Sequence, residues 1–163
     1  MSKNLKVGVF GVGRGMDLAK NFKLNNCEIV AICDFHKERL EKAIAKCDSS
    51  VAVYENFDEF KQKNKGIYYY FTRYGRKPHT SFDFSNKENQ ELYFIFGKES
   101  TGIPKSILKD DLEHCMRIPM TDKVRALNVS NSVAIAIYEA LRQQDYNDLL
   151  REEPHKGADW LEK

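Results

Sequence analysis

Apolar and polar positions alternate along the chain in short blocks that predict strands and helices in turn. Compact apolar runs rich in β-branched and aromatic residues are typical of buried strands, and these runs cover residues 5–10, 28–33, 51–54, 67–72, 92–96 and 116–118. Apolar residues at helical spacing predict helices between them, over residues 16–24, 37–46, 57–62, 104–110 and 130–143. Because such alternation favours parallel strands covered by helices, the sequence predicts an α/β fold, with helices on both faces of a parallel sheet.

A polar stretch at residues 61–66, with the sequence KQKNKG, interrupts this pattern and predicts a connector. It separates a first half, residues 1–60, from a second half, residues 61–150. The last residues, 151–163, are mostly polar and predict a tail that packs weakly.

Composition narrows the class of protein. The chain has 163 residues, of which 42% are hydrophobic and 31% charged, enough for one ordinary domain or two half-domains. No apolar run approaches the roughly 18 residues that a membrane span needs, so no membrane partner is expected. The four cysteines form no CxxC pair, which predicts reduced thiols in a cytoplasmic protein and no metal site. The formal net charge of +2 leaves any nucleic-acid contact to a local patch.

A glycine-rich turn follows the first predicted strand. Gly11 and Gly13 fit the first two glycines of the GxGxxG pattern, in which the backbone approaches a pyrophosphate, but Met16 stands at the third position. Asp34 ends the second predicted strand, at the spacing where an acid holds a ribose hydroxyl. Two interpretations stay open: a site for NAD(P), or a strand–helix–strand unit that keeps the glycine turn only for folding.

The first 60 residues resemble the start of the Gfo/Idh/MocA oxidoreductases. The similarity runs through GVFGVGRGM, CDFHKERLEKA and VAVYENFDEF. It implies a Rossmann-like half that binds a nicotinamide cofactor. The Glu-Lys-Pro motif and the long substrate domain of that family are both missing, so the resemblance implies a cofactor-binding fragment without chemistry.

Three segments of the second half belong together: FTRYGRKPHTSFDF, IFGKESTGIP and RIPMTDKVRALNVSNSVAIAIYEALRQQ. Gly97 and Gly102 bracket a loop after a predicted strand, where backbone can approach a ligand without a Cβ in the way. Asn128 or Ser130 caps the following helix. In order and spacing the segments resemble the SpoU branch of the SPOUT RNA 2′-O-methyltransferases, closest to those that modify the wobble nucleotide of tRNA.

This resemblance implies an α/β knot in the second half, S-adenosylmethionine as cofactor, tRNA as substrate and a homodimer. The residues that it implies for the cofactor site are Phe71, Gly97, Gly102, Ile118, Met120 and Ala126. Those that it implies for the catalytic pocket are Glu99, Arg125, Asn128 and Ser130. A basic patch could touch RNA phosphates or be an ordinary solvated loop, and consists of Arg73, Arg76 and Lys77. The aromatic run 68–71 predicts a core strand, and His79 and His114 are expected at the surface.

The first loop departs from the SpoU pattern. That family carries a Pro-Asn-Thr-Gly-Asn-like loop and then an arginine credited with activating the ribose hydroxyl. In this chain the corresponding residues, 11–16, are glycine-rich. Arg14 lies among them, but no catalytic role is carried onto it. The chain therefore reads as a hybrid, or chimera, of two families. The leading interpretation is a tRNA ribose 2′-O-methyltransferase impaired by this loss. The alternatives are a non-catalytic hybrid that binds S-adenosylmethionine, NAD or both, and a nicotinamide oxidoreductase, which would lack its reacting domain.

Overall fold

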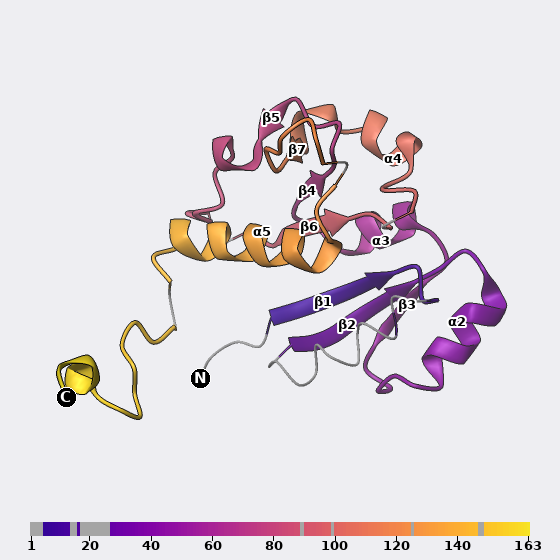
Figure 1. Cartoon of the computed structure of the whole chain (residues 1–163). Helices are drawn as coiled ribbons and strands as arrows, with labels where there is room; N and C mark the ends of the chain where they lie inside the picture. Colours follow the sequence, from indigo (N-terminus) through magenta and orange to yellow (C-terminus); the bar gives the residue numbers. More distant parts are fainter. Residues whose placement is uncertain are drawn as a thin grey trace. The chain divides into compact units, whose positions relative to one another are not determined.

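The computed structural model describes the chain except for its first four residues and a few internal stretches (Figure 1). The described ranges are 5–13, 16, 27–88, 90–98, 100–124, 126–146 and 149–163. Two compact units are present, Met1–Lys65 and Gly66–Lys163, and each is described by itself.

The first unit is built on a sheet of three parallel strands in the order β1-β2-β3. These are β1 (Leu5–Phe10), β2 (Cys27–Cys33) and β3 (Ala52–Tyr54). Two helices follow the second and third strands: α2 (Lys37–Ile44) and α3 (Phe57–Lys63).

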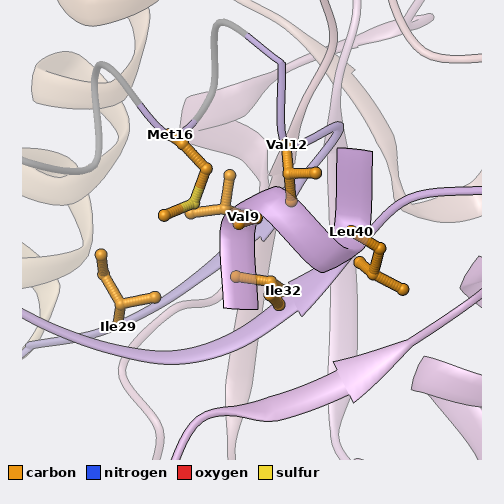
Figure 2. Close-up of a cluster of buried hydrophobic side chains, with 7 residues drawn as sticks. Val9, Val12, Met16, Ile29, Ile32 and Leu40 are labelled. Atoms are coloured by element: carbon orange, nitrogen blue, oxygen red, sulfur yellow. The ribbon is translucent and has the colours of Figure 1, made fainter. Parts of the chain in front are cut away.

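Successive residues of a strand point to opposite faces of its sheet, and each face of the first sheet has its own helix. Val9 packs with Ile32 and with Leu40 of α2 in a buried cluster (Figure 2). On the opposite face the ring of Phe10 contacts that of Phe57 of α3 edge-on, with 5.3 Å between centroids. The predicted helices on both faces are thus confirmed for this unit.

The second unit is built on a sheet of four parallel strands in the order β5-β7-β4-β6. The strands are β4 (Ile67–Phe71), β5 (Lys77–Pro78), β6 (Leu92–Phe96) and β7 (Cys115–Arg117). The helices are α4 (Lys105–Lys109) and α5 (Val129–Gln143), with short 3-10 turns η1 (His79–Ser81), η2 (Leu112–His114) and η3 (Ala158–Glu162).

Aromatic rings fill the core of the second unit. The fully buried ring of Phe84 lies 4.9 Å from that of Tyr69 and 5.2 Å from that of Phe94, both edge-on. Ala136 and Ala140 of α5 belong to the same buried cluster. Small residues on this face of α5 let the helix approach the aromatic layer closely, so α5 and the sheet share one core.

The structure confirms most predicted elements and changes two points of the architecture. The strands form two hydrogen-bonded sheets rather than one. Strand β5 is new, because two residues with the sequence Lys-Pro carry no strand pattern. The predicted helix 16–24 lies almost wholly outside the described residues. Within the described ranges, no helix has the length and apolarity that a membrane crossing requires.

Candidate functional site

Three parallel strands of the second unit end at the same edge of their sheet. Phe71, the last residue of β4, is in register with Phe96, the last residue of β6, and with Met116 of β7. Gly97 follows β6 directly and Ile118 follows β7 directly. The loops after these strands therefore begin side by side, at the carboxyl edge where α/β sheets bind ligands.

The loop after β4 lies directly against the backbone of β7. The Thr72 amide donates to the Met116 carbonyl at 2.9 Å. A Cβ on Gly75 would stand 2.3 Å from the Met116 carbonyl carbon, a distance that no side chain tolerates. Gly75 was not expected from the sequence, since a glycine between Tyr74 and Arg76 is typical of an ordinary turn. Arg73, Arg76 and Lys77 are all exposed here, as a phosphate-binding patch requires.

The loop after β6 closes upon itself. A Cβ on Gly97 would stand 2.2 Å from the Gly102 carbonyl carbon, and the Gly102 amide donates to the Lys98 carbonyl at 2.7 Å. Gly102 has φ +71°, which favours glycine. The expected reason for Gly97, the approach of a ligand, is therefore incomplete, because the loop itself already requires a glycine there. Glu99 lies outside the described residues.

The loop after β7 leads into α5. Ile118 packs against the buried cluster of the second unit, Met120 is half-buried and Ala126 is exposed. The Asn128 side chain accepts a hydrogen bond from the Ser130 amide at 2.8 Å, so Asn128, and not Ser130, is the N-cap of α5. Arg125 lies outside the described residues.

The far end of α5 holds the segment that precedes β6. Gln143 accepts from the Phe84 amide at 2.6 Å and donates to the Phe82 carbonyl at 3.0 Å. Gln144 donates to the Phe84 carbonyl at 2.8 Å. We call these three hydrogen bonds the glutamine clamp. They supply the segment with the backbone partners that a neighbouring strand would otherwise give.

One histidine near this end of the helix is buried. The expectation of a surface position is wrong for His79, which is 8% exposed and whose Nδ1 has no hydrogen-bond partner within the described part of the chain. His114 is half-buried, with Nδ1 2.6 Å from an Asp111 carboxylate oxygen.

Glu139 of α5 has a lowered pKa. A hydrogen bond from Arg142 lowers the pKa of Glu139 to about 2, and His79 adds to this effect.

In the first unit, Asp34 joins the glycine turn to the end of β2. Its carboxylate accepts from the Val12 amide at 3.0 Å and from the His36 amide at 2.9 Å, and the residue is 3% exposed. Gly11, with φ +87°, donates its amide to the Cys33 carbonyl at 2.8 Å, and Gly13 follows in the exposed part of the turn. A carboxylate so enclosed has a structural role, so this geometry favours the folding interpretation of Gly11, Gly13 and Asp34 over NAD binding.

Comparison with known proteins gives a family match across both units. The model of the SpoU rRNA Methylase family matches residues 12–138. A Geobacillus stearothermophilus protein named as a tRNA (cytidine(34)-2′-O)-methyltransferase is 48% identical over 101 residues, which are 61% of this chain and 64% of that protein. The chain thus covers less than two thirds of this relative's length. The family match begins inside the first unit, so it does not support a hybrid of two families.

Solved structures agree with this match. A protein described as an RNA methyltransferase from Bacillus anthracis has a TM-score of 0.64 and 34% identity, over 91% of this chain and 98% of that one. A SpoU methyltransferase from Streptomyces viridochromogenes, solved with the cofactor AdoMet, has a TM-score of 0.56 over 90% of this chain and 63% of that one. At 14% identity the second likeness concerns the fold alone.

Proposed function

Because the chain belongs to the SpoU rRNA Methylase family, we propose that it transfers a methyl group from S-adenosylmethionine to the ribose 2′-oxygen of nucleotide 34 in tRNA. The observation that carries this proposal is the shared edge of β4, β6 and β7, where three loops begin side by side. Nucleotide 34 is taken from the name of the Geobacillus relative. Because the proposed substrate of this protein is tRNA, we place the proposed activity in the cytoplasm.

The cofactor site consists of the three loops at this edge. Ile118 and Met120 offer half-buried apolar side chains, and the loop closed at Gly97 and Gly102 offers backbone groups. Phe71 and Ala126 complete the set of cofactor residues. In this proposal the loops are threaded as the family's knot, and the close approach of Gly75 to the backbone of Met116 supports such threading.

Catalysis requires that the ribose hydroxyl lose its proton during attack, which a positioned group assists. S-adenosylmethionine, when bound, supplies the electrophilic methyl group. We assign this assistance to Glu99, Arg125, Asn128 and Ser130. The hydrogen bond that the Ser130 amide donates to the Asn128 side chain fixes the first turn of α5 and with it the position of Ser130. Arg73, Arg76 and Lys77 would contact RNA phosphates beside this pocket.

We expect the protein to keep its affinity for the cofactor while its turnover is impaired. S-adenosylhomocysteine should bind with a micromolar Kd, about −8 kcal/mol. Turnover should lie at least about 100-fold below that of a relative with the arginine segment, since general acid–base help is worth roughly 10²–10⁴ in rate. Calorimetry and single-turnover transfer of a radiolabelled methyl group to a tRNA transcript measure the two quantities.

A tRNA already methylated at the 2′-oxygen of nucleotide 34 is the control substrate and should accept no label. Failure of the protein to bind S-adenosylhomocysteine, or equal labelling of both tRNAs, would contradict the proposal. Labelling at the full rate of such a relative would contradict the expected impairment alone.

We also propose that the protein acts as a homodimer through α5. This helix exposes Ile135 (36%) and Tyr138 (62%), and such apolar surface is typical of interfaces. Light scattering at micromolar concentration should give twice the chain mass, and Tyr138→Glu should give a monomer. Leu112→Glu, at an exposed apolar residue of η2, is the matched control and should stay dimeric. A monomeric wild-type protein would contradict this proposal.

A further inference from the structure

A pocket of about 220 Å³ lies in the first unit, between the glycine turn after β1 and the face of α2. Val12 and Met16 give it an apolar floor continuous with the buried cluster of Figure 2. Its charged lining comes from Arg39, Lys42 and Lys46. None of the residues that line it belongs to the proposed cofactor site.

The three cations face the pocket together because of their spacing. Arg39 and Lys42 are three positions apart on α2, and Lys46 follows in the turn after the helix, so all three share one side. Each is exposed, and none forms an ion pair within the described residues. Lys37, at the start of the same helix, by contrast lies 3.7 Å from a Glu55 carboxylate oxygen. The pocket therefore presents three positive charges without a described partner.

The rest of the pocket also suits an anion. Among the described residues, no atom lies within 4 Å of the position of a Cβ on Gly13, so none of them fills the space beside this glycine. The nearby Asp34 carboxylate is buried, and both of its oxygens accept backbone amides. Arginine and lysine side chains donate strong, charge-assisted hydrogen bonds to phosphate oxygens.

We propose that this pocket binds phosphate groups of the RNA strand. The inference rests on the proposed function, because it takes the tRNA substrate as the ligand. It adds a second RNA contact, in the first unit, to the basic patch of the second. A purely structural role for Lys42 and Lys46 is the alternative, since cations near a helix C-terminus stabilise the helix dipole.

The test compares two triple variants of the full chain that lose the same charge. The pocket variant carries Arg39→Gln, Lys42→Gln and Lys46→Gln. The control variant carries Lys6→Gln, Lys63→Gln and Lys65→Gln, all at exposed positions of the first unit outside the pocket. Affinity for a tRNA transcript is measured by fluorescence anisotropy over a range of salt concentrations, together with methyl transfer at saturating tRNA, thermal unfolding and a titration with 5′-AMP.

The pocket variant should bind tRNA at least about tenfold more weakly. The negative slope of log affinity against log salt should become shallower by about 2, for three lost phosphate contacts at roughly 0.7 each. The control variant should change affinity less than about twofold by the same rule. Equal affinities and slopes in the two variants would overturn the inference. It would also be overturned if the pocket variant unfolded at a lower temperature but bound tRNA as the wild type does.

Saturable 5′-AMP binding that only the pocket variant loses, with tRNA affinity unchanged, would also overturn the RNA assignment and indicate a mononucleotide site. If wild-type protein binds tRNA and transfers methyl groups while both triple variants match it, the pocket inference fails and the proposed function stands. If wild-type protein binds no tRNA, both fail. Under the inference, methyl transfer at saturating tRNA stays unchanged in the control variant.

Discussion

Replacing Gly97 with alanine is expected to lower the affinity for S-adenosylhomocysteine by about 10- to 100-fold. The new Cβ would stand 2.2 Å from the Gly102 carbonyl carbon and 2.3 Å from the Ile103 amide nitrogen. Both are backbone atoms, so no side-chain rotation relieves the contact and the loop after β6 must move. Forced overpacking typically costs about 1–3 kcal/mol and occasionally more, and each 1.4 kcal/mol is about tenfold in affinity.

Gly13→Ala is the matched control, since its Cβ would meet no described atom within 4 Å. The same substitution in this open turn should leave the Kd for S-adenosylhomocysteine within about twofold. Calorimetric titration of the three proteins measures the effect. Equal Kd values for the wild type and Gly97→Ala would show that the loop after β6 does not shape the cofactor site.

Phe84→Ala is expected to lower the free energy of unfolding of the second unit by about 3–5 kcal/mol. Phe84 is fully buried between the rings of Tyr69 and Phe94, and the glutamine clamp holds its backbone in place. Truncation removes the transfer energy of the ring and leaves a cavity that the clamped segment cannot easily close. Urea unfolding, followed by a probe in the second unit, measures the change.

Leu112→Ala provides the comparison for this substitution. Leu112 is 55% exposed on η2, and surface changes of this kind usually stay within about 0.5 kcal/mol. A loss below about 1 kcal/mol for Phe84→Ala would mean that the aromatic layer of the second unit repacks freely.

The elements that could be predicted are those whose pattern is local. β6 begins and ends where its apolar run does, and β4 is buried as its aromatic run predicts. β5 was missed because its two residues become a strand only through pairing with β7, nearly forty positions away in the chain. The division into two sheets likewise depends on partners and not on sequence blocks.

The candidate site shows the same limit at the level of single residues. Asp34 stands at the spacing of a ribose-binding acid, and only its two amide partners show that the carboxylate is engaged within the fold. His79 carries no pattern that distinguishes a buried histidine from a surface one, because its burial depends on neighbours from other elements, such as the ring of Phe71 at the end of β4. Gly97 was found through its motif, while the main reason for the glycine became visible only with the position of Gly102.

The glutamine clamp also determines when the second unit can complete its core as the chain is synthesised on the ribosome. The Phe82 and Phe84 backbone groups find their partners 59 to 61 positions later in the chain, at the end of α5. While the ribosome is still adding those residues, the segment before β6 has strands beside it but lacks its amide partners. Contacts so distant in sequence form slowly, because a long loop must close first. Completion of the second core therefore waits until the last long helix has left the exit tunnel, whereas every strand of the first unit has emerged well before.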